Sequence, residues 1–214
     1  MLKRTMGQSR WLILALLCVA LCGCGDDRPK VRAAFNEYIQ ALLKRDSQKA
    51  VMRVDQASLD YYSEMRRLAL EAGPVDLAAR TPVDRLMVGM IRVNTTPSYL
   101  RQLTGSQLYM YAVQEGWSLD DAMPTSEISD IEVDGDTATA TCTARGHLSA
   151  MDYHFVKESG QWKLNITASL EAISSALKHN AATENVPLDQ FLITVLHDFA
   201  PEKTVTESVW QKPK

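Results

Sequence analysis

The sequence predicts an α+β protein, because two hydrophobic periods follow one another along the chain. Apolar side chains recur every three or four positions from residue 31 to residue 115, which is the period of amphipathic helices. Between residues 127 and 166 apolar and polar side chains alternate instead, which is the period of strands. Helical spacing returns after residue 169. We therefore expect helices, then a sheet, then further helices.

The first two helices are expected at residues 31–43 and 47–54. The apolar face of the first consists of Val31, Ala34, Phe35, Tyr38, Ile39, Leu42 and Leu43. Pro29 lies just before it and suits a helix entry. Asp46 can cap the second helix, because its carboxylate can accept a hydrogen bond from a free N–H group of the first turn.

A third helix is expected over residues 57–72, with Gly73-Pro74 as its end. Its apolar face consists of Leu59, Tyr62, Met65, Leu68 and Ala69. Thr81 and Pro82 predict another helix start, since threonine caps helices and proline is tolerated in their first turn. Two shorter helical pieces are expected at residues 97–103, ending at Gly105, and 107–115, ending at Gly116.

Four strands are expected next, as an antiparallel meander. Their ranges are residues 127–133, 137–144, 148–156 and 161–166. Asp134-Gly135 separates the first two strands and is a strong signal for a tight hairpin. Residues 158–160, Glu-Ser-Gly, form the turn between the last two. Cys142 falls on the same face as the alanines of its strand, so we expect a buried and inert thiol there.

The chain is expected to end in helices at residues 169–177 and 187–199, with a linker at 180–187. Residues 201–214 are interpreted as a polar tail.

The amino terminus has the composition of an export signal. Lys3, Arg4 and Arg10 precede an uncharged apolar run from residue 11 to residue 21. This run is much shorter than the roughly 20 residues that a transmembrane helix needs. We therefore expect a signal peptide that is removed on export.

Leu21-Cys22-Gly23-Cys24 resembles the bacterial lipobox, in which a small residue precedes an acylated cysteine. The resemblance implies cleavage between Gly23 and Cys24 and a palmitate-type lipid anchor on the Cys24 thiol. Gly25, directly after the cysteine, favours the outer membrane over the inner one by the sorting habit of that family. The alternative is an ordinary secretory signal that contains cysteines by coincidence. The chain is thus divided into a signal peptide (1–23), a lipidated tether (24–30), an α+β domain (31–168) and a C-terminal helical extension with its tail (169–214).

Charge and cysteine content exclude further classes. Removal of the signal peptide reduces 23 basic residues to 20 against 26 acidic ones, which gives a net charge of −6. A negative domain without a basic stripe lacks the footprint of a nucleic-acid-binding protein. With Cys24 acylated, Cys142 has no partner for a disulfide, so the fold must depend on an apolar core.

Residues 131–140 and 153–164, with the phrase FVKESGQWKL at 155–164, resemble the closing hairpins of the NTF2-like superfamily. The likeness covers residues 31–166 and implies a cone of N-terminal helices packed on a curved antiparallel meander. The superfamily includes ketosteroid isomerases and polyketide cyclases of the SnoaL kind, but also catalytically inert binding modules. The helical stretch between Gly73 and Gly116 and the C-terminal helices depart from its usual pattern.

Few residues suggest chemistry. Asp152 and His154 lie two apart in an expected strand, so their side chains share one face and could form an acid/base pair in a cone interior. The alternative is that Met151, Tyr153 and Phe155 form the core while this pair faces solvent. Tyr61, Tyr62, Tyr109 and Tyr111 are interpreted mainly as core residues. No histidine has a metal-ligand spacing, and no cofactor motif occurs, so neither a metal nor a cofactor is expected.

The expected function is therefore a lipid-anchored protein of the cell envelope that binds a protein partner or a small apolar ligand without catalysis. The alternative is an enzyme of the isomerase or cyclase type that uses Asp152 and His154. A third possibility is an assembly role, in which the helix at residues 187–199 docks on another envelope protein.

Overall fold

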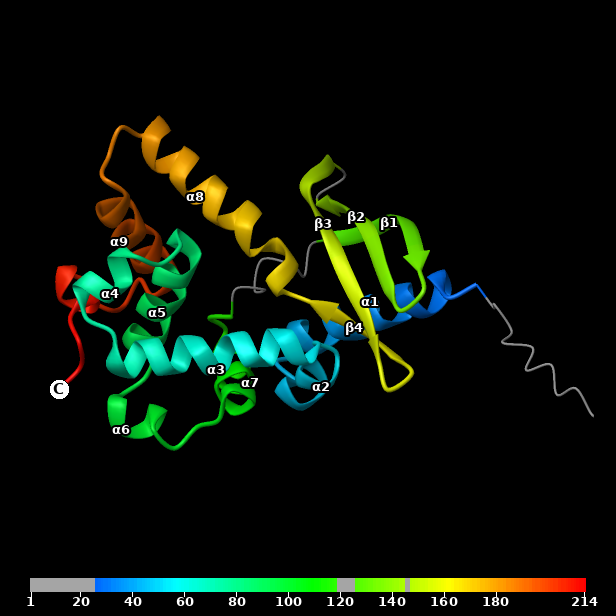
Figure 1. Cartoon of the computed structure of the whole chain (residues 1–214), viewed down its shortest axis with the longest axis horizontal. Helices are drawn as coiled ribbons and strands as arrows, with labels where there is room; N and C mark the ends of the chain where they lie inside the picture. Colours follow the sequence, from blue (N-terminus) through cyan, green and yellow to red (C-terminus); the bar gives the residue numbers. More distant parts are fainter. Residues whose placement is uncertain (1–25, 119–125, 145–146) are drawn as a thin grey trace, which may run out of the picture.

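The computed structural model describes residues 26–118, 126–144 and 147–214 and has an α+β fold (Figure 1). Its helices are α1 (Arg28–Leu43), α2 (Ser47–Met52), α3 (Gln56–Glu71), α4 (Pro74–Ala78), α5 (Pro82–Asn94), α6 (Pro97–Leu100), α7 (Gly105–Glu115), α8 (Leu170–Thr183) and α9 (Leu188–Phe199). The strands are β1 (Ser126–Asp134), β2 (Thr137–Ala144), β3 (His147–Glu158) and β4 (Gln161–Asn165). Two short 3₁₀ helices are η2 (Thr167–Ser169) and η3 (Glu207–Trp210). The α+β class and its order along the chain are thereby confirmed.

The strands form one antiparallel sheet in the order β1-β2-β3-β4, which confirms the expected meander. Two-residue turns close the hairpins at Gly135-Asp136 and Ser159-Gly160. Gly135, Ser159 and Gly160 have positive φ angles of 58°, 50° and 78°, as tight hairpins require. The turn signals of the sequence therefore place both hairpins correctly.

Helix α1 packs against one face of the sheet at one end of the molecule (Figure 1). Phe35 contacts Tyr153 and Phe155, with ring centroids 5.2 Å and 6.5 Å apart. The strand residues buried on this face include Ala138, Ala140, Cys142, Tyr153, Phe155, Trp162 and Leu164. The small side chains of β2 leave room for the helix, and the expected burial of Cys142 is confirmed.

A short backbone junction ties the helices to the sheet. Leu164 N donates to Arg53 O at 2.8 Å, and Asp55 N donates to Leu164 O at 3.0 Å. The Asp55 carboxylate caps α3 by accepting from Ser58 N at 2.9 Å, and Ser58 Oγ accepts from Ile166 N at 2.9 Å. The start of α3 is therefore fixed to the end of β4.

Helix α5 is the centre of the helical half. Its buried residues are Pro82, Val83, Arg85, Leu86, Met87, Val88, Gly89, Met90 and Ile91. Helices α3, α8 and α9 and the short helix η3 contact it. Gly89 allows this, because a Cβ atom there would lie 2.6 Å from Leu196 and 3.3 Å from Trp210. The C-terminal extension is thus part of the same core as the first half of the chain.

The structure corrects four details of the sequence interpretation. Helix α8 continues to Thr183, because Ala181 extends its buried face beyond Leu177, so the linker is shorter than residues 180–187. Pro74 begins the short helix α4 after the expected stop. Gly105 begins α7 instead of ending the preceding helix. Residues 201–214 are more than a polar tail, because they contain η3 and bury Trp210.

We expect Gly105→Ala to lower the free energy of unfolding by about 1–3 kcal/mol, the usual cost of overpacking. The added methyl group would lie 2.0 Å from Ser63 Oγ and 2.7 Å from Ser63 N, and this backbone belongs to α3 and cannot move aside cheaply. Urea denaturation followed by circular dichroism measures the loss. Gly73→Ala is the control, since its nearest contact would be 3.8 Å away. Equal losses in the two variants would contradict the close approach of α3 and α7.

Candidate functional site

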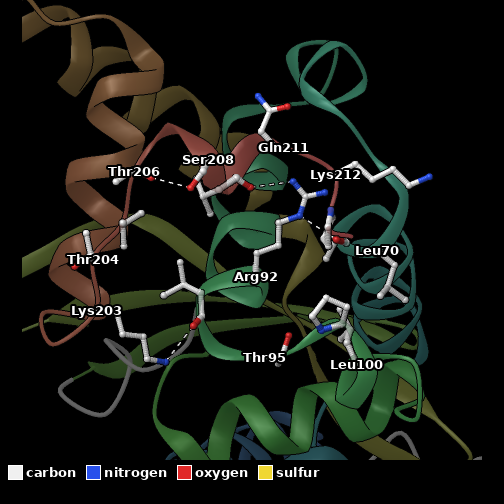
Figure 2. A pocket seen from close by; sticks show the side chains of 16 residues that line it. Leu70, Arg92, Thr95, Leu100, Lys203, Thr204, Thr206, Ser208, Gln211 and Lys212 are labelled. Carbon is white, nitrogen blue, oxygen red and sulfur yellow. Dashed lines mark hydrogen bonds between the residues drawn. The ribbon is translucent and has the colours of Figure 1, made fainter.

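Residues 203–213, together with residues of α3, α5 and α6, line an open hollow of about 390 Å³, which we term the tail hollow (Figure 2). It is lined by Ala69, Leu70, Arg92, Val93, Thr95, Pro97, Leu100, Lys203, Thr204, Val205, Thr206, Ser208, Val209, Gln211, Lys212 and Pro213. Figure 2 shows Arg92 directed from α5 toward η3, with Lys203 and Lys212 on either side of it. The lining combines apolar side chains with hydroxyl groups and cations.

Arg92 is the central polar residue of the tail hollow. Its guanidinium donates to the carbonyl oxygens of Ala69 at 2.9 Å, Ala72 at 2.6 Å and Leu68 at 3.3 Å, all at the end of α3. It also donates to Val209 O in η3 at 2.9 Å. The last carbonyls of a helix lack intrahelical partners and attract a cation. One side chain therefore caps α3 and holds the C-terminal segment in place.

The positive charge of the tail hollow is not balanced by carboxylates. Lys203 Nζ donates to Val93 O at 3.2 Å and to Asn94 Oδ1 at 2.8 Å. Both acceptors are neutral, like the carbonyl oxygens that accept from Arg92. Within the residues that the structure describes, Arg92, Lys203 and Lys212 form no salt bridge, and no Asp or Glu lines the tail hollow. Burial lowers the pKa of Arg92 to about 10, so its guanidinium stays protonated at neutral pH. This is a cationic hollow in an acidic protein.

The polar groups of the tail hollow also include hydroxyls. Thr206 Oγ1 and Ser208 Oγ lie 2.7 Å apart within hydrogen-bond distance of each other. Leu70, Val93 and Leu100 form its apolar part. This arrangement can hold a small molecule with an acidic group at one end and an apolar group at the other.

A second hollow, of about 470 Å³, lies between α1 and α2. Its charged side chains mostly neutralise one another, since Arg53 pairs with Glu37, and Lys49 pairs with Asp46 at 2.9 Å. The tail hollow is therefore the better candidate for a charged ligand.

The structure places Asp152 and His154 outside the core. Asp152 is exposed and His154 half-buried, on the sheet face opposite the buried rings of Tyr153 and Phe155. Their strand neighbours are Thr141 for Asp152 and Thr139 and Asn165 for His154. The two residues share a face as expected, but they line neither the tail hollow nor the hollow between α1 and α2.

The four tyrosines predicted to be core residues are buried in the core or packed against it. Tyr62 and Tyr109 are fully buried and pack edge to face with ring centroids 5.1 Å apart, and the hydroxyl groups of Tyr38 and Tyr109 lie 2.9 Å apart. The half-buried Tyr61 donates to Asp84 at 3.1 Å. Burial and this carboxylate raise the pKa of Tyr61 far above its usual value.

Sequence reasoning missed the tail hollow, because residues 201–214 lack helical or strand periodicity. The available signal was Trp210, a large apolar residue in an otherwise polar segment.

Gly23 and Cys24 lie outside the described residues. Among the residues that are described, no group of three His, Cys, Asp or Glu side chains could hold a metal ion. In the same part of the chain, no helix has the length and apolar character needed to cross a membrane.

No protein-family model, curated protein or solved structure matches this chain.

We expect Arg92→Lys to loosen the C-terminal segment. A lysine ammonium lacks the planar fork that lets Arg92 reach α3 and η3 together. Loss of these charged hydrogen bonds should lower the free energy of unfolding by about 2–3 kcal/mol. Hydrogen exchange followed by mass spectrometry should show faster exchange in residues 203–213. The exposed Arg101→Lys provides the control, and unchanged exchange in the Arg92 variant would refute the role of Arg92.

Proposed function

We propose that the protein is a lipid-anchored component of the bacterial cell envelope that acts by binding a ligand without catalysis. The signal-peptide composition of residues 1–23 and the lipobox-like Leu21-Cys22-Gly23-Cys24 support the anchor. Acylation of Cys24 would hold the mature protein at a membrane surface, with the outer membrane favoured by Gly25. Two acyl chains are enough for stable anchoring, since each buried CH₂ contributes about 0.8 kcal/mol.

The NTF2-like assignment of residues 31–168 belongs to this proposal. Its support is the amphipathic α1 on an antiparallel meander, with Trp162 of the closing hairpin buried beside it. In this arrangement α3 to α7 form an insertion between α2 and the sheet. Fold likeness alone does not select a function, so the proposed activity depends on the tail hollow.

The observation that carries the binding function is the unbalanced positive charge of the tail hollow. We expect its ligand to be a small organic acid with an apolar part, since Arg92 and Lys203 offer cations while Leu70, Val93 and Leu100 offer apolar contact. This refines the expectation of a simply apolar ligand. A half-buried cation without an ionic partner, such as Arg92, favours binding of an anion.

The other functions have less support. An isomerase or cyclase would need its acid/base pair in a cavity, whereas Asp152 is exposed. Docking through α9 would need its apolar face, but Phe191, Leu192 and Leu196 of that helix are already buried within the chain. Removing α9 would therefore expose α5 and would not leave the rest of the fold intact.

We expect Cys24→Ala to abolish lipid attachment and Cys22→Ala to preserve it. Only Cys24 follows a small residue, Gly23, at the expected cleavage site. Labelling of growing cells with a radioactive fatty acid, followed by the mass of the amino-terminal peptide, measures both attachment and cleavage. A labelled Cys24→Ala protein would overturn the assignment of the acylated residue, and an unlabelled wild-type protein would overturn the lipid anchor.

The binding function is tested by native mass spectrometry on residues 26–214, exported from a bacterial host with a cleavable secretory leader. We expect a retained small acid, and lower occupancy when Lys203→Gln and Lys212→Gln are combined. Lys44→Gln with Lys178→Gln is the control, because these exposed lysines lie outside the tail hollow and remove the same charge. An empty wild-type protein, or equal occupancy in both double variants, would contradict binding in the tail hollow.

A further inference from the structure

The folded body begins almost immediately after the proposed lipid site. Only Gly25 and Asp26 separate Cys24 from Asp27, the residue just before the first residue of α1. Fully extended, the three steps from Cys24 to Asp27 span about 10 Å. Helix α1 alone has 16 residues, which corresponds to about 24 Å. If Cys24 is acylated, as proposed above, the tether is shorter than the body that it holds.

Asp27 is fixed to the sheet by its side chain. Its carboxylate accepts from Lys157 Nζ at 2.7 Å and from Trp162 Nε1 at 3.2 Å, and both partners belong to the β3–β4 hairpin. It also accepts from Lys30 Nζ at 2.6 Å. These donors hold the pKa of Asp27 well below its usual value, so the carboxylate is ionised at neutral pH. Asp27 therefore cannot swing away from the body to lengthen the tether.

Asp26 is also engaged. Its carboxylate accepts from Arg28 Nε at 2.8 Å and from Arg28 Nη2 at 3.0 Å. This exposed pair joins Asp26 only to the first residue of α1, so the firm attachment of the chain to the body begins at Asp27, three residues after Cys24. A lipid anchor there must bring the amino-terminal end of α1 to the headgroup layer, which is only about 5–7 Å thick on each side of a bilayer.

The two hairpin turns lie at this same end of the body. Lys157 N donates to Asp136 O at 2.8 Å, so the β1–β2 turn lies beside the Asp27 clamp. The β3–β4 turn follows directly after the Lys157–Trp162 pair. Figure 1 shows the start of α1 and the sheet that carries these turns toward one end of the long axis, and the C-terminal segment with η3 at the other. We term the first of these ends the clamp end.

We propose that the clamp end rests directly on the phospholipid headgroups and that the tail hollow faces away from the membrane. The short tether enforces this contact, whereas charge attraction does not. Cations at the clamp end lie among an equal number of carboxylates, since Arg28 pairs with Asp26, Lys30 and Lys157 share Asp27, and Asp136 lies near Lys157. The contact should therefore persist at high salt and with uncharged lipids. It presents the tail hollow to molecules that arrive from the aqueous side.

The orientation is measured on the full-length lipidated protein in phosphatidylethanolamine and phosphatidylglycerol vesicles that contain a nitroxide-headgroup lipid. A fluorophore is attached at Q161C, next to the β3–β4 turn, or at E184C, in the α8–α9 loop, and both sites are exposed. The buried Cys142 is not expected to react. We expect strong quenching at position 161, none at position 184, and no change in 1 M salt.

A matched variant tests the role of the tether. Twenty Gly and Ser residues inserted between Gly25 and Asp26 add a flexible span of about 25 Å. We expect this insertion to remove most of the quenching at position 161 while the protein still floats with the vesicles. Equal quenching at positions 161 and 184, or quenching unaffected by the insertion, would overturn the proposed orientation. A wild-type protein that does not float with vesicles would instead overturn the lipid anchor itself, so the two failures are distinguishable.

Discussion

The backbone junction between residues 53–55 and Leu164 is the constraint on which the rest of the structure depends. Two hydrogen bonds and the parallel bridge from Val54 to Leu164 fix the start of α3 beside the last strand. Because α3 is one continuous helix of 16 residues, this fixed start also determines where its far end lies. The Arg92 guanidinium meets the carbonyls at that far end. The sheet and the tail hollow are thus coupled through one helix.

At each end of the molecule, one charged side chain connects two elements that are far apart in the sequence. At the clamp end the Asp27 carboxylate collects donors from α1 and from the β3–β4 hairpin. At the tail hollow the Arg92 guanidinium collects acceptors from α3 and from η3. The difference lies in the balance of charge, because Asp27 meets two ammonium groups whereas Arg92 meets only neutral carbonyls. Arg92 therefore keeps its positive charge without an ionic partner, and the proposal that the tail hollow binds an anion is based on this difference.

Local features of the fold could be predicted from the sequence, and long-range ones could not. The caps at Asp46 and Thr81 and the turn at Asp134-Gly135 depend on neighbours within a few residues, and the structure contains all three features. The prediction that Gly105 ends a helix was wrong, because a glycine is required there by a long-range contact. A Cβ atom at this position would collide with Leu59 and Ser63, more than 40 positions earlier in the chain. Likewise, the partners of Arg92 and Asp27 come from elements far apart in the sequence. The hydrophobic periods of strands and helices, two and 3.6 residues, carry no information about such contacts. Neither the tail hollow nor the contacts of Asp27 could therefore be predicted from the sequence.

The burial of α5 from several sides has a consequence for the order in which the protein matures. Its apolar surface is covered by α3 on one side but by α9 and η3 on another, and Trp210 of η3 lies 116 positions after Asn94, the last residue of α5. A chain that emerges from its amino terminus therefore exposes α5 until residues 188–210 have also emerged. The helical half therefore completes its core only after these later residues have joined it. Until Trp210 packs beside Gly89, the apolar surface of α5 stays open to contact with other chains, so the segment that lines the tail hollow also protects the folding chain from aggregation.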